Sequence, residues 1–256
     1  MNKSHLELTC PRSVRPLNQR VGSLESGRWH YAPSDRPLFV AGYNALCAVD
    51  LTGRRALEVC CGRGELAVEL ARAFPGAAVI ANDRHPTAGK FIHEAHGRGE
   101  VSNLAYECGD ALDLSRHSDG SLDLVFGQAA LHHLAHDVPA VGREYSRVLR
   151  PGARLIFIFE PLGHNPVVAM IRAWRVSREE MGDESNVFLG MLEEIGENFS
   201  RCEVQVFNLF GYPLKGLKGR FGETLATASH RLDSALIGRF PRLARYAANF
   251  NVIFTR

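Results

Sequence analysis

Hydrophobic and polar positions alternate in blocks along the middle of the chain, and these blocks predict strands and helices in turn. Short apolar runs of the length of buried strands lie at 55–60, 77–81, 101–107, 121–127 and 154–159. Between these runs, apolar residues recur at the spacing of a helix, at 65–74, 87–96 and 139–149. Pro75-Gly76 and Pro151-Gly152 separate blocks. Strands that alternate with helices indicate a parallel sheet covered on both faces.

The two ends of the chain follow a different pattern. Residues 1 to about 36 are polar and contain several prolines, which predicts an irregular or partly helical arm, and 38–49 has the pattern of a short helix. A helix is expected at 188–196, and strands at 203–210 and 248–255. The insertion at 211–247 has helical spacing at Leu225, Ala228, Leu232 and Leu236.

The most informative segment runs from Ala56 to Ala67, with the sequence ALEVCCGRGELA. It predicts a strand, a glycine turn and the start of a helix. Gly62 and Gly64 have no Cβ, so a ligand can lie against the backbone. This arrangement is the nucleotide-binding corner of a doubly wound α/β sheet.

Composition narrows the class of protein. A chain of 256 residues is long enough for one large α/β domain, and 45% hydrophobic with 23% charged residues is typical of globular proteins. The net charge of +2 gives no reason to expect a nucleic-acid or membrane partner. The N-terminus has no apolar signal segment, and the six cysteines include no C-x-x-C pair. We therefore expect reduced thiols and a cytoplasmic location. The histidine groups lack nearby carboxylates or thiols at ligand spacing, so no metal site is expected.

Several motifs in order resemble the class I S-adenosylmethionine-dependent methyltransferases over residues 50–162, with a sixth and seventh strand beyond. The matching segments are Glu58 to Gly64, Ala81 to Arg84, Gly109-Asp110-Ala111, Phe126-Gly127-Gln128, Leu131 to Leu134 and Glu144 to Gly152. The resemblance implies a Rossmann-like, doubly wound sheet of seven strands, mostly parallel with an antiparallel last strand. It also implies helical lid elements around that sheet. We expect an N-terminal arm and cap helix at 1–50 and a methyltransferase domain at 51–256.

The resemblance also assigns roles in binding S-adenosyl-L-methionine, whose product is S-adenosyl-L-homocysteine. Asp83 lies 25 positions after Glu58, where a carboxylate at the switch point accepts both ribose hydroxyls. Asp110 is expected to accept the adenine amino group, with the Ala111 backbone beside it. Gly62 and Gly64 admit the methionyl tail, and Glu58 offsets the positive charge of the ligand. The expected cofactor-binding set is Glu58, Cys60, Gly62, Gly64, Asp83, Arg84, Asp110, Ala111, Gln128 and Tyr31, the last an aromatic of the arm that closes over the cofactor.

Two features keep other functions open. Cys60 stands where the family usually has glycine, and a side chain there could narrow the methionyl pocket. A protein that binds S-adenosylmethionine without transferring methyl is therefore one alternative. Residues 62–67 also match the G-x-G-x-x-G/A dinucleotide fingerprint, which makes an NAD(P)-dependent oxidoreductase the other. Glu65 in the first turn of the helix would repel a pyrophosphate, and this, together with the downstream motifs, favours methyl transfer over hydride transfer.

The acceptor is expected to be a small organic molecule with an O, N or C nucleophile. His132 and His133 are candidates for a general base, and a structural role at this helix start is the alternative. Glu160 and His164 follow strand five on the ligand side, where they contact substrate or form a turn. Segments 1–45, about 160–195 and 211–247 are expected to line the substrate pocket as a lid. The nine Lys or Arg residues against three Asp or Glu residues from 201 to 256 form either solvated helix faces or a basic rim. A nucleic-acid partner is disfavoured, and the oligomeric state is left open.

Overall fold

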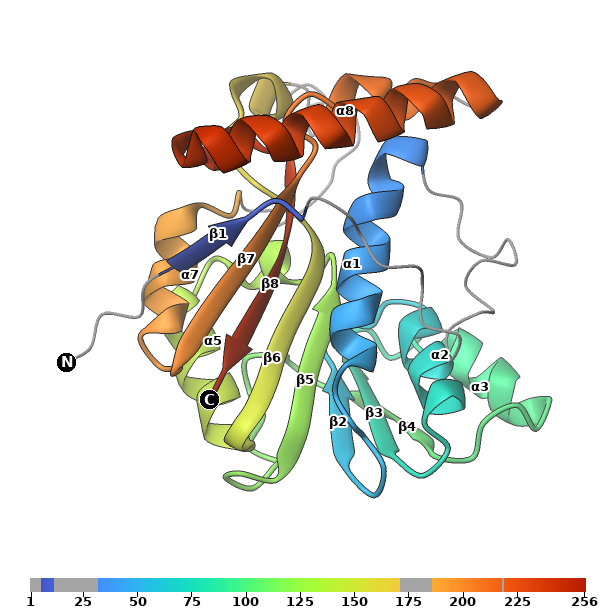
Figure 1. The fold of residues 1–256 in the computed structure, drawn as a ribbon. Helices are drawn as coiled ribbons and strands as arrows, with labels where there is room; N and C mark the ends of the chain where they lie inside the picture. The colour runs from blue at the N-terminus through green and yellow to red at the C-terminus, as the bar shows by residue number, and fades with distance from the viewer. Residues whose placement is uncertain (1–5, 12–31, 171–185, 218) are drawn as a thin grey trace.

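One sheet of eight strands forms the centre of the molecule, with helices on both faces (Figure 1). The computed structural model describes residues 6–11, 32–170, 186–217 and 219–256. The strands are β1 (Leu6–Thr9), β2 (Arg55–Glu58), β3 (Ala78–Asp83), β4 (Leu104–Cys108), β5 (Leu122–Gln128), β6 (Leu149–Pro161), β7 (Arg201–Phe207) and β8 (Asn249–Thr255). The α-helices are α1 (Arg36–Cys47), α2 (Glu65–Ala73), α3 (Lys90–Gly97), α4 (Leu131–Leu134), α5 (Val138–Val148), α7 (Leu189–Gly196) and α8 (Gly219–Arg239). Short 3₁₀ helices are η2 (Pro33–Asp35), η3 (Tyr212–Gly216) and η4 (Pro241–Tyr246).

The strand order in the described part of the chain is β1-β7-β8-β6-β5-β2-β3-β4, and of these strands only β8 pairs antiparallel to its neighbours. The predicted Rossmann-like fold with an antiparallel last strand is thereby confirmed. The eighth strand is a difference, because β1 lies in the segment expected to be irregular or helical. It pairs in parallel with β7, with Leu6 opposite Cys202 and Leu8 opposite Val204. Four residues are too few for a period-two pattern to stand out, and the existing edge of β7 is what stabilises this strand.

Neighbouring residues of each central strand pack into two separate cores. Leu57 and Val125 belong to the core beneath α5 and α7, whereas Ala56 and Leu124 belong to the core beneath α1, α2 and α3. Successive side chains of a strand point to opposite faces, so strands buried on both faces read as continuous apolar runs. This explains why the sequence pattern located the central strands well.

The topology reverses between β2 and β5. From β2 the sheet extends through β3 to β4 on one side, and through β5 to β6 on the other. In open α/β sheets, ligands bind at such a switch point, beyond the carboxyl ends of the strands. The fold therefore places a candidate site at the ends of β2, β3 and β5.

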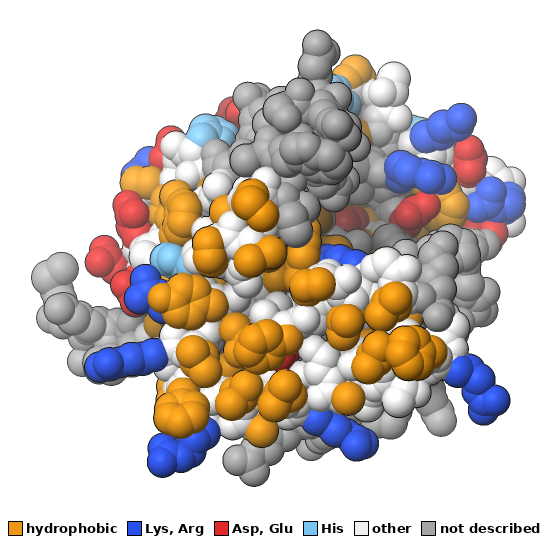
Figure 2. All heavy atoms as spheres, turned by 90° about the horizontal axis from the view of Figure 1, so that it is seen from above, with side chains coloured by type: hydrophobic (Ala, Val, Ile, Leu, Met, Phe, Trp, Pro, Cys, Tyr) orange, Lys and Arg blue, Asp and Glu red, His pale blue; other side chains and the backbone are white. Residues whose placement is uncertain are grey.

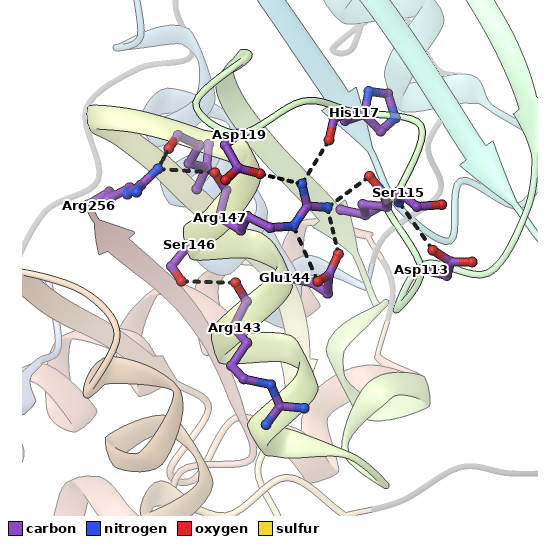
Figure 3. A network of polar contacts seen from close by, with 11 residues as sticks. Asp113, Ser115, His117, Asp119, Arg143, Glu144, Ser146, Arg147 and Arg256 are labelled. Atoms are coloured by element: carbon purple, nitrogen blue, oxygen red, sulfur yellow. Dashed lines mark hydrogen bonds and ion pairs between the residues drawn. The ribbon is translucent and has the colours of Figure 1, made fainter.

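Arg147 ties α5 to the loop between β4 and β5 (Figure 3). Its guanidinium donates to the carbonyls of Leu114 and His117, at 3.0 and 2.9 Å, and to the carboxylates of Asp119 and Glu144, both at 2.8 Å. These contacts raise the pKa of Arg147, first through the hydrogen bond to Glu144. The planar fork of arginine suits this set of acceptors, and it fixes the loop that begins with Gly109-Asp110.

Helix α8 lies across the end of the sheet at which the parallel strands finish (Figure 1). It is the helix expected inside the 211–247 insertion. Its buried Asp233 accepts hydrogen bonds from the backbone N–H groups of Leu209 and Phe210, at 2.9 and 3.2 Å. The Ser234 hydroxyl donates to the Cys10 carbonyl at 3.0 Å. Polar side chains thus attach this helix to the loops that follow β7 and β1.

The carboxyl of Asp233 should give the protein a measurable pH dependence of stability. Burial raises the pKa of Asp233 from 3.8 to about 6 in the folded state, so the folded protein binds the proton more tightly than the unfolded chain. This group therefore adds stability as the pH falls below about 6, and that contribution is absent above it. Between pH 7.5 and pH 5, we expect the free energy of unfolding of the wild type to gain roughly 1.4 kcal/mol relative to Asp233→Asn. Urea unfolding of both proteins at the two pH values measures this, and parallel pH profiles would contradict it.

Candidate functional site

Four predicted binding positions meet at the carboxyl edge of the sheet. Glu58, the last residue of β2, pairs with Ala81 of β3 and Phe126 of β5. Asp83 ends β3 and pairs with Cys108, just before Gly109-Asp110. Gln128 ends β5. Residues far apart in the sequence are thus brought to one edge.

The glycine turn after β2 is held by Asp83. The Asp83 Oδ2 atom accepts the backbone N–H of Gly62 at 2.8 Å, and its Oδ1 atom accepts the N–H of His85 at 3.0 Å. Gly62 and Gly64 have φ values of 53° and 79°, the left-handed region that favours glycine. A Cβ on Gly62 would meet nothing within 4 Å, whereas one on Gly64 would lie 2.5 Å from Ile92. The turn therefore keeps open backbone surface at Gly62 and close packing at Gly64.

Glu58 lies buried beneath this turn, with 2% of its surface exposed. Its carboxyl accepts a hydrogen bond from the backbone of Ala67 in the first turn of α2, where the preceding Gly64 has no capping side chain. Burial raises the pKa of Glu58 well above its usual value, and nearby Asp83 adds to the shift. A cationic ligand would favour the ionised form.

Among the described residues, the buried acceptor atoms at this edge without a hydrogen-bond partner include Oε2 of Glu58 and Oε1 of Gln128. Buried polar atoms are rarely left without a partner. A ligand that carries hydrogen-bond donors and a positive charge would satisfy both atoms. The acceptor-rich edge and the open turn at Gly62 therefore fit S-adenosylmethionine, whose ammonium, hydroxyl and amino groups donate hydrogen bonds.

The predicted adenine position follows β4. Asp110 is exposed, and its Oδ1 atom accepts the backbone N–H of Leu112 at 2.9 Å, while Ala111 is buried. The Asx turn at Asp110 and the contacts of Arg147 fix this loop from both sides. Arg84 is exposed beside Asp83, and its carbonyl lies 3.5 Å from the Cys108 sulfur. Tyr31 lies outside the described residues.

Cys60 has a backbone φ of 51°, in the left-handed region. This explains why the related family has glycine at the position, since the turn itself requires a conformation that costs other residues roughly 1–2 kcal/mol. Burial and neighbouring carboxylates raise the pKa of the Cys60 thiol to about 12, which keeps it neutral. The effect of cysteine here is thus conformational as well as steric.

Replacing Cys60 by glycine should release this strain. We expect Cys60→Gly to raise the free energy of unfolding by up to about 1 kcal/mol, offset in part by the greater chain entropy of glycine. Cys60→Val, which is β-branched, should lower it. Thermal denaturation of both variants measures the difference, with Cys61→Ala as a buried neighbour outside the left-handed region. A less stable Cys60→Gly protein would show that the native turn carries no strain.

A buried carboxylate organises the predicted His132–His133 segment. Glu160, near the end of β6, is 0% exposed. Its Oε1 atom accepts the backbone N–H groups of Ala130 and Leu131 at 2.6 and 2.8 Å. Its Oε2 atom lies 3.3 Å from the His132 backbone nitrogen and 2.9 Å from His132 Nδ1. An ionised carboxylate only accepts, so it selects the imidazole tautomer that has its proton on Nδ1 and its lone pair on Nε2.

His132 and His133 differ in their surroundings. His132 is 6% exposed, whereas His133 is exposed, although the two ring centroids lie only 4.2 Å apart. A fixed tautomer favours His132 as the base. The sequence predicted Glu160 as a substrate contact or a turn residue, not as a partner of His132, because a spacing of 28 positions between the two gives no local signal. His164 accepts the backbone N–H of Leu189 at 3.2 Å, which is a structural contact. Within the described ranges, no group of three metal-ligating side chains is found.

The fold and the edge described above define a Rossmann-like α/β protein with a ligand site at the switch point. Residues 56–152 match the family described as "Methyltransferase domain". That segment contains Glu58, the glycine turn, Asp83, Asp110 and the two histidines, and the predicted resemblance to class I S-adenosylmethionine-dependent methyltransferases is confirmed.

Proteins that are similar to this chain in sequence are named as methyltransferases. The phthiotriol/phenolphthiotriol dimycocerosates methyltransferase of Mycobacterium leprae is 36% identical over 109 residues, which are 43% of this chain and 38% of that protein. The ubiquinone biosynthesis O-methyltransferase of Xanthomonas oryzae pv. oryzae is 36% identical over 107 residues, which are 42% of this chain and 43% of that protein. The chain thus matches about two fifths of the length of these relatives.

The fold has solved counterparts. The geranyl diphosphate C-methyltransferase of Streptomyces coelicolor, in complex with Mg²⁺, geranyl diphosphate and S-adenosyl-L-homocysteine, has a TM-score of 0.59. That comparison covers 100% of this chain and 91% of the other, at 12% identity, and it shows a shared fold.

Proposed function

We propose that this protein is an enzyme that transfers a methyl group from S-adenosyl-L-methionine to an O, N or C nucleophile of a small organic acceptor. The observation that carries this proposal is the carboxyl edge itself. An open glycine turn, an acid that holds it and two buried acceptor atoms without described partners lie within the segment that matches the methyltransferase family.

We assign each residue of the proposed site a separate role in binding the cofactor. Asp83 positions the turn and retains acceptor capacity for ribose hydroxyls, because each carboxylate oxygen has two lone pairs. Gly62 and Gly64 accommodate the methionyl tail, and Glu58 faces its positive charge. Asp110 and Ala111 hold the adenine, while Gln128, Arg84, Cys60 and Tyr31 complete the proposed set. The bound cofactor supplies an electrophilic methyl group on a sulfonium, which a nucleophile displaces in line.

The Glu160–His132 pair supplies the proposed base. A neutral imidazole with its proton on Nδ1 accepts a proton at Nε2, and Glu160 stabilises the imidazolium that forms. An oxygen nucleophile needs such a base, whereas a neutral amine needs only orientation. His133 is proposed as a residue of the site rim, since it is exposed next to His132.

The two alternatives make different demands on the same edge. A nicotinamide dinucleotide would place a pyrophosphate at the start of α2, where Glu65 is the first helical residue. The relatives named above are methyltransferases of a lipid and of a quinone pathway by their names, and they support methyl transfer to a small acceptor. A protein that binds S-adenosylmethionine without transferring methyl would have the same carboxyl edge. Only a measurement of turnover distinguishes it from a methyltransferase.

Turnover tests the proposal directly. Purified protein is incubated with methyl-labelled S-adenosylmethionine and a panel of phenols, amines, carboxylic acids and isoprenoids. Formation of S-adenosylhomocysteine in equal amount to a labelled acceptor supports the proposal. Binding of the cofactor with no labelled product over a broad panel favours the non-transferring alternative, and oxidation of NADH would overturn methyl transfer.

We propose further that residues 1–50 act as an arm and cap helix and that 160–195 and 211–247 form a lid over the acceptor, with 51–256 as the methyltransferase domain. Support comes from α8, which lies at the carboxyl end of the strands (Figure 1). The six cysteines are free thiols, which supports a reducing, cytoplasmic setting. No helix among the described residues has the length and apolar character of a membrane span.

A further inference from the structure

Helix α8 carries a stripe of apolar side chains on its solvent side. Phe221 is 70% and Leu232 is 51% exposed, although they lie opposite a buried face that contains Gly222, Ala226, Asp233, Ser234 and Ile237. Phe221, Leu225, Ala228 and Leu232 are separated by four, three and four residues, so they form one stripe along the helix. In the usual amphipathic arrangement the apolar side faces the core and the outer side is polar, whereas α8 buries Ala226 and Ile237 and also presents this apolar stripe to solvent.

The apolar surface continues beyond the helix. Phe210 and Phe240 are each 52% exposed and Tyr246 is 42% exposed, and they flank α8 in the sequence on either side. Figure 2, which views the molecule from the α8 side, shows hydrophobic side chains gathered over this face and basic side chains at its margin. We call the exposed apolar residues of α8 and these three aromatic residues the α8 face. Monomeric proteins rarely expose a contiguous apolar patch of this kind without a function for it.

The charges around the α8 face are mostly of one sign. The basic residues of α8 and η4 are Arg220, Arg231, Arg239, Arg242 and Arg245. The acids of these two elements are Glu223 and the buried Asp233, whose pKa burial raises to about 6.

The arginines also shape hollows in the surface. A shallow hollow on α8 is lined by Arg231, Ala235, Gly238 and Arg239. A second hollow is lined in part by Pro241, Arg242 and Arg245. The guanidinium carbons of Arg239 and Arg245 lie 5.1 and 5.5 Å from the ring centres of Phe240 and Tyr246. Arginines that pair in a hollow or stack on aromatic rings offer phosphate-binding groups beside apolar surface.

We propose that the α8 face docks on the surface of an anionic phospholipid bilayer. An apolar stripe bordered by arginines is the arrangement that lies in a membrane interface, with the side chains in the acyl boundary and the cations among the headgroups. A second copy of the chain fits less well, because association through this face would bring two sets of arginines together with few acids to pair them.

The position of the α8 face relates membrane docking to the candidate site. The α8 face lies at the end of the sheet where the parallel strands finish, the same end as the candidate site (Figure 1). An acceptor dissolved in the bilayer could therefore reach the site without crossing water. The docking itself does not rest on methyl transfer, so its test uses lipid binding alone.

Vesicle cosedimentation of the full chain tests this inference. Vesicles of phosphatidylcholine alone are compared with vesicles that contain phosphatidylglycerol, at low and high salt. We expect binding only to the anionic vesicles, weakened by salt. Arg239→Gln with Arg242→Gln should weaken it roughly 30-fold, at about 1 kcal/mol for each arginine. Phe221→Ser with Leu232→Ser should weaken it as well.

Arg143→Gln is the matched control, since Arg143 is an exposed arginine on α5, away from the α8 face. It should bind vesicles like the wild type. Circular dichroism and thermal melting show whether each variant folds. Equal binding to neutral and anionic vesicles, or no vesicle binding by the wild type, would overturn the inference. If the wild type does not bind vesicles but forms a dimer, and the double substitution Phe221→Ser with Leu232→Ser dissociates that dimer, the α8 face is an interface with a second copy of the chain instead.

Discussion

Asp83→Ala should lower the affinity for S-adenosylmethionine by roughly 100-fold. The substitution removes a carboxylate that holds the Gly62 turn through a hydrogen bond of 2.8 Å and that we assign to the ribose hydroxyls. Charge-assisted hydrogen bonds contribute roughly 1.5–3 kcal/mol each, and loss of one or two accounts for such a change. Isothermal titration calorimetry measures it, and S-adenosylhomocysteine should be affected to the same extent because it has the same ribose.

Glu94→Gln provides the control for Asp83→Ala. Glu94 is an acid of α3 whose side chain is 46% exposed and pairs at the surface with Arg98. Its substitution should leave cofactor affinity unchanged. An Asp83→Ala protein that melts like the wild type and binds the cofactor equally well would remove Asp83 from the site.

Glu160→Gln should lower kcat by roughly 100-fold for an acceptor that must lose a proton, with little change in cofactor affinity. General bases typically contribute 10²–10⁴-fold, and the amide of glutamine would reverse the tautomer of His132 by donating to Nδ1. The variant should also lose roughly 1–3 kcal/mol of stability, because the carboxylate accepts backbone N–H groups at the start of α4. Since Glu160 acts through His132, it is a positioning residue.

The choice of acceptor separates this role from a structural one. For an acceptor that must lose a proton, His132→Gln should lower kcat about as far as Glu160→Gln does, whereas both variants should retain turnover of a neutral amine. His133→Gln should retain the wild-type kcat with either acceptor. His133 is the matched control, because it is the exposed neighbour in the same short helix. Full activity of a folded Glu160→Gln protein at every pH would exclude the proposed base.

The central strands and the carboxyl edge that carries the candidate site could be predicted because their signals are local. A strand buried on both faces reads as a short apolar run, and a glycine turn followed by an acid after the next strand has a fixed order along the chain. These rules predict the glycine turn and the position of Asp83, whereas the roles of Glu58 and Asp110 are implied by the family resemblance.

The remaining features depend on contacts between distant segments. β1 needs the edge of β7, which lies almost 200 positions away. The role of Glu160 in holding His132 depends on the packing of β6 beside α4, which no local pattern in the sequence indicates. The stripe at Leu225 and Leu232 has helical spacing, but spacing does not say which side of a helix faces the core. The side that does so contains Ala226, Asp233, Ser234 and Ile237 instead. The excess of Lys and Arg over Asp and Glu from 201 to 256 is visible in the sequence, but its position around the exposed apolar stripe of α8 is not.

The measurement that tests the account most directly is a calorimetric titration of the purified protein with S-adenosylmethionine, S-adenosylhomocysteine and NADH. We expect both sulfur compounds to bind at one site and NADH to cause no heat of binding. Binding of NADH, with neither sulfur compound bound, would contradict the assignment of the carboxyl edge and make the glycine turn a dinucleotide site.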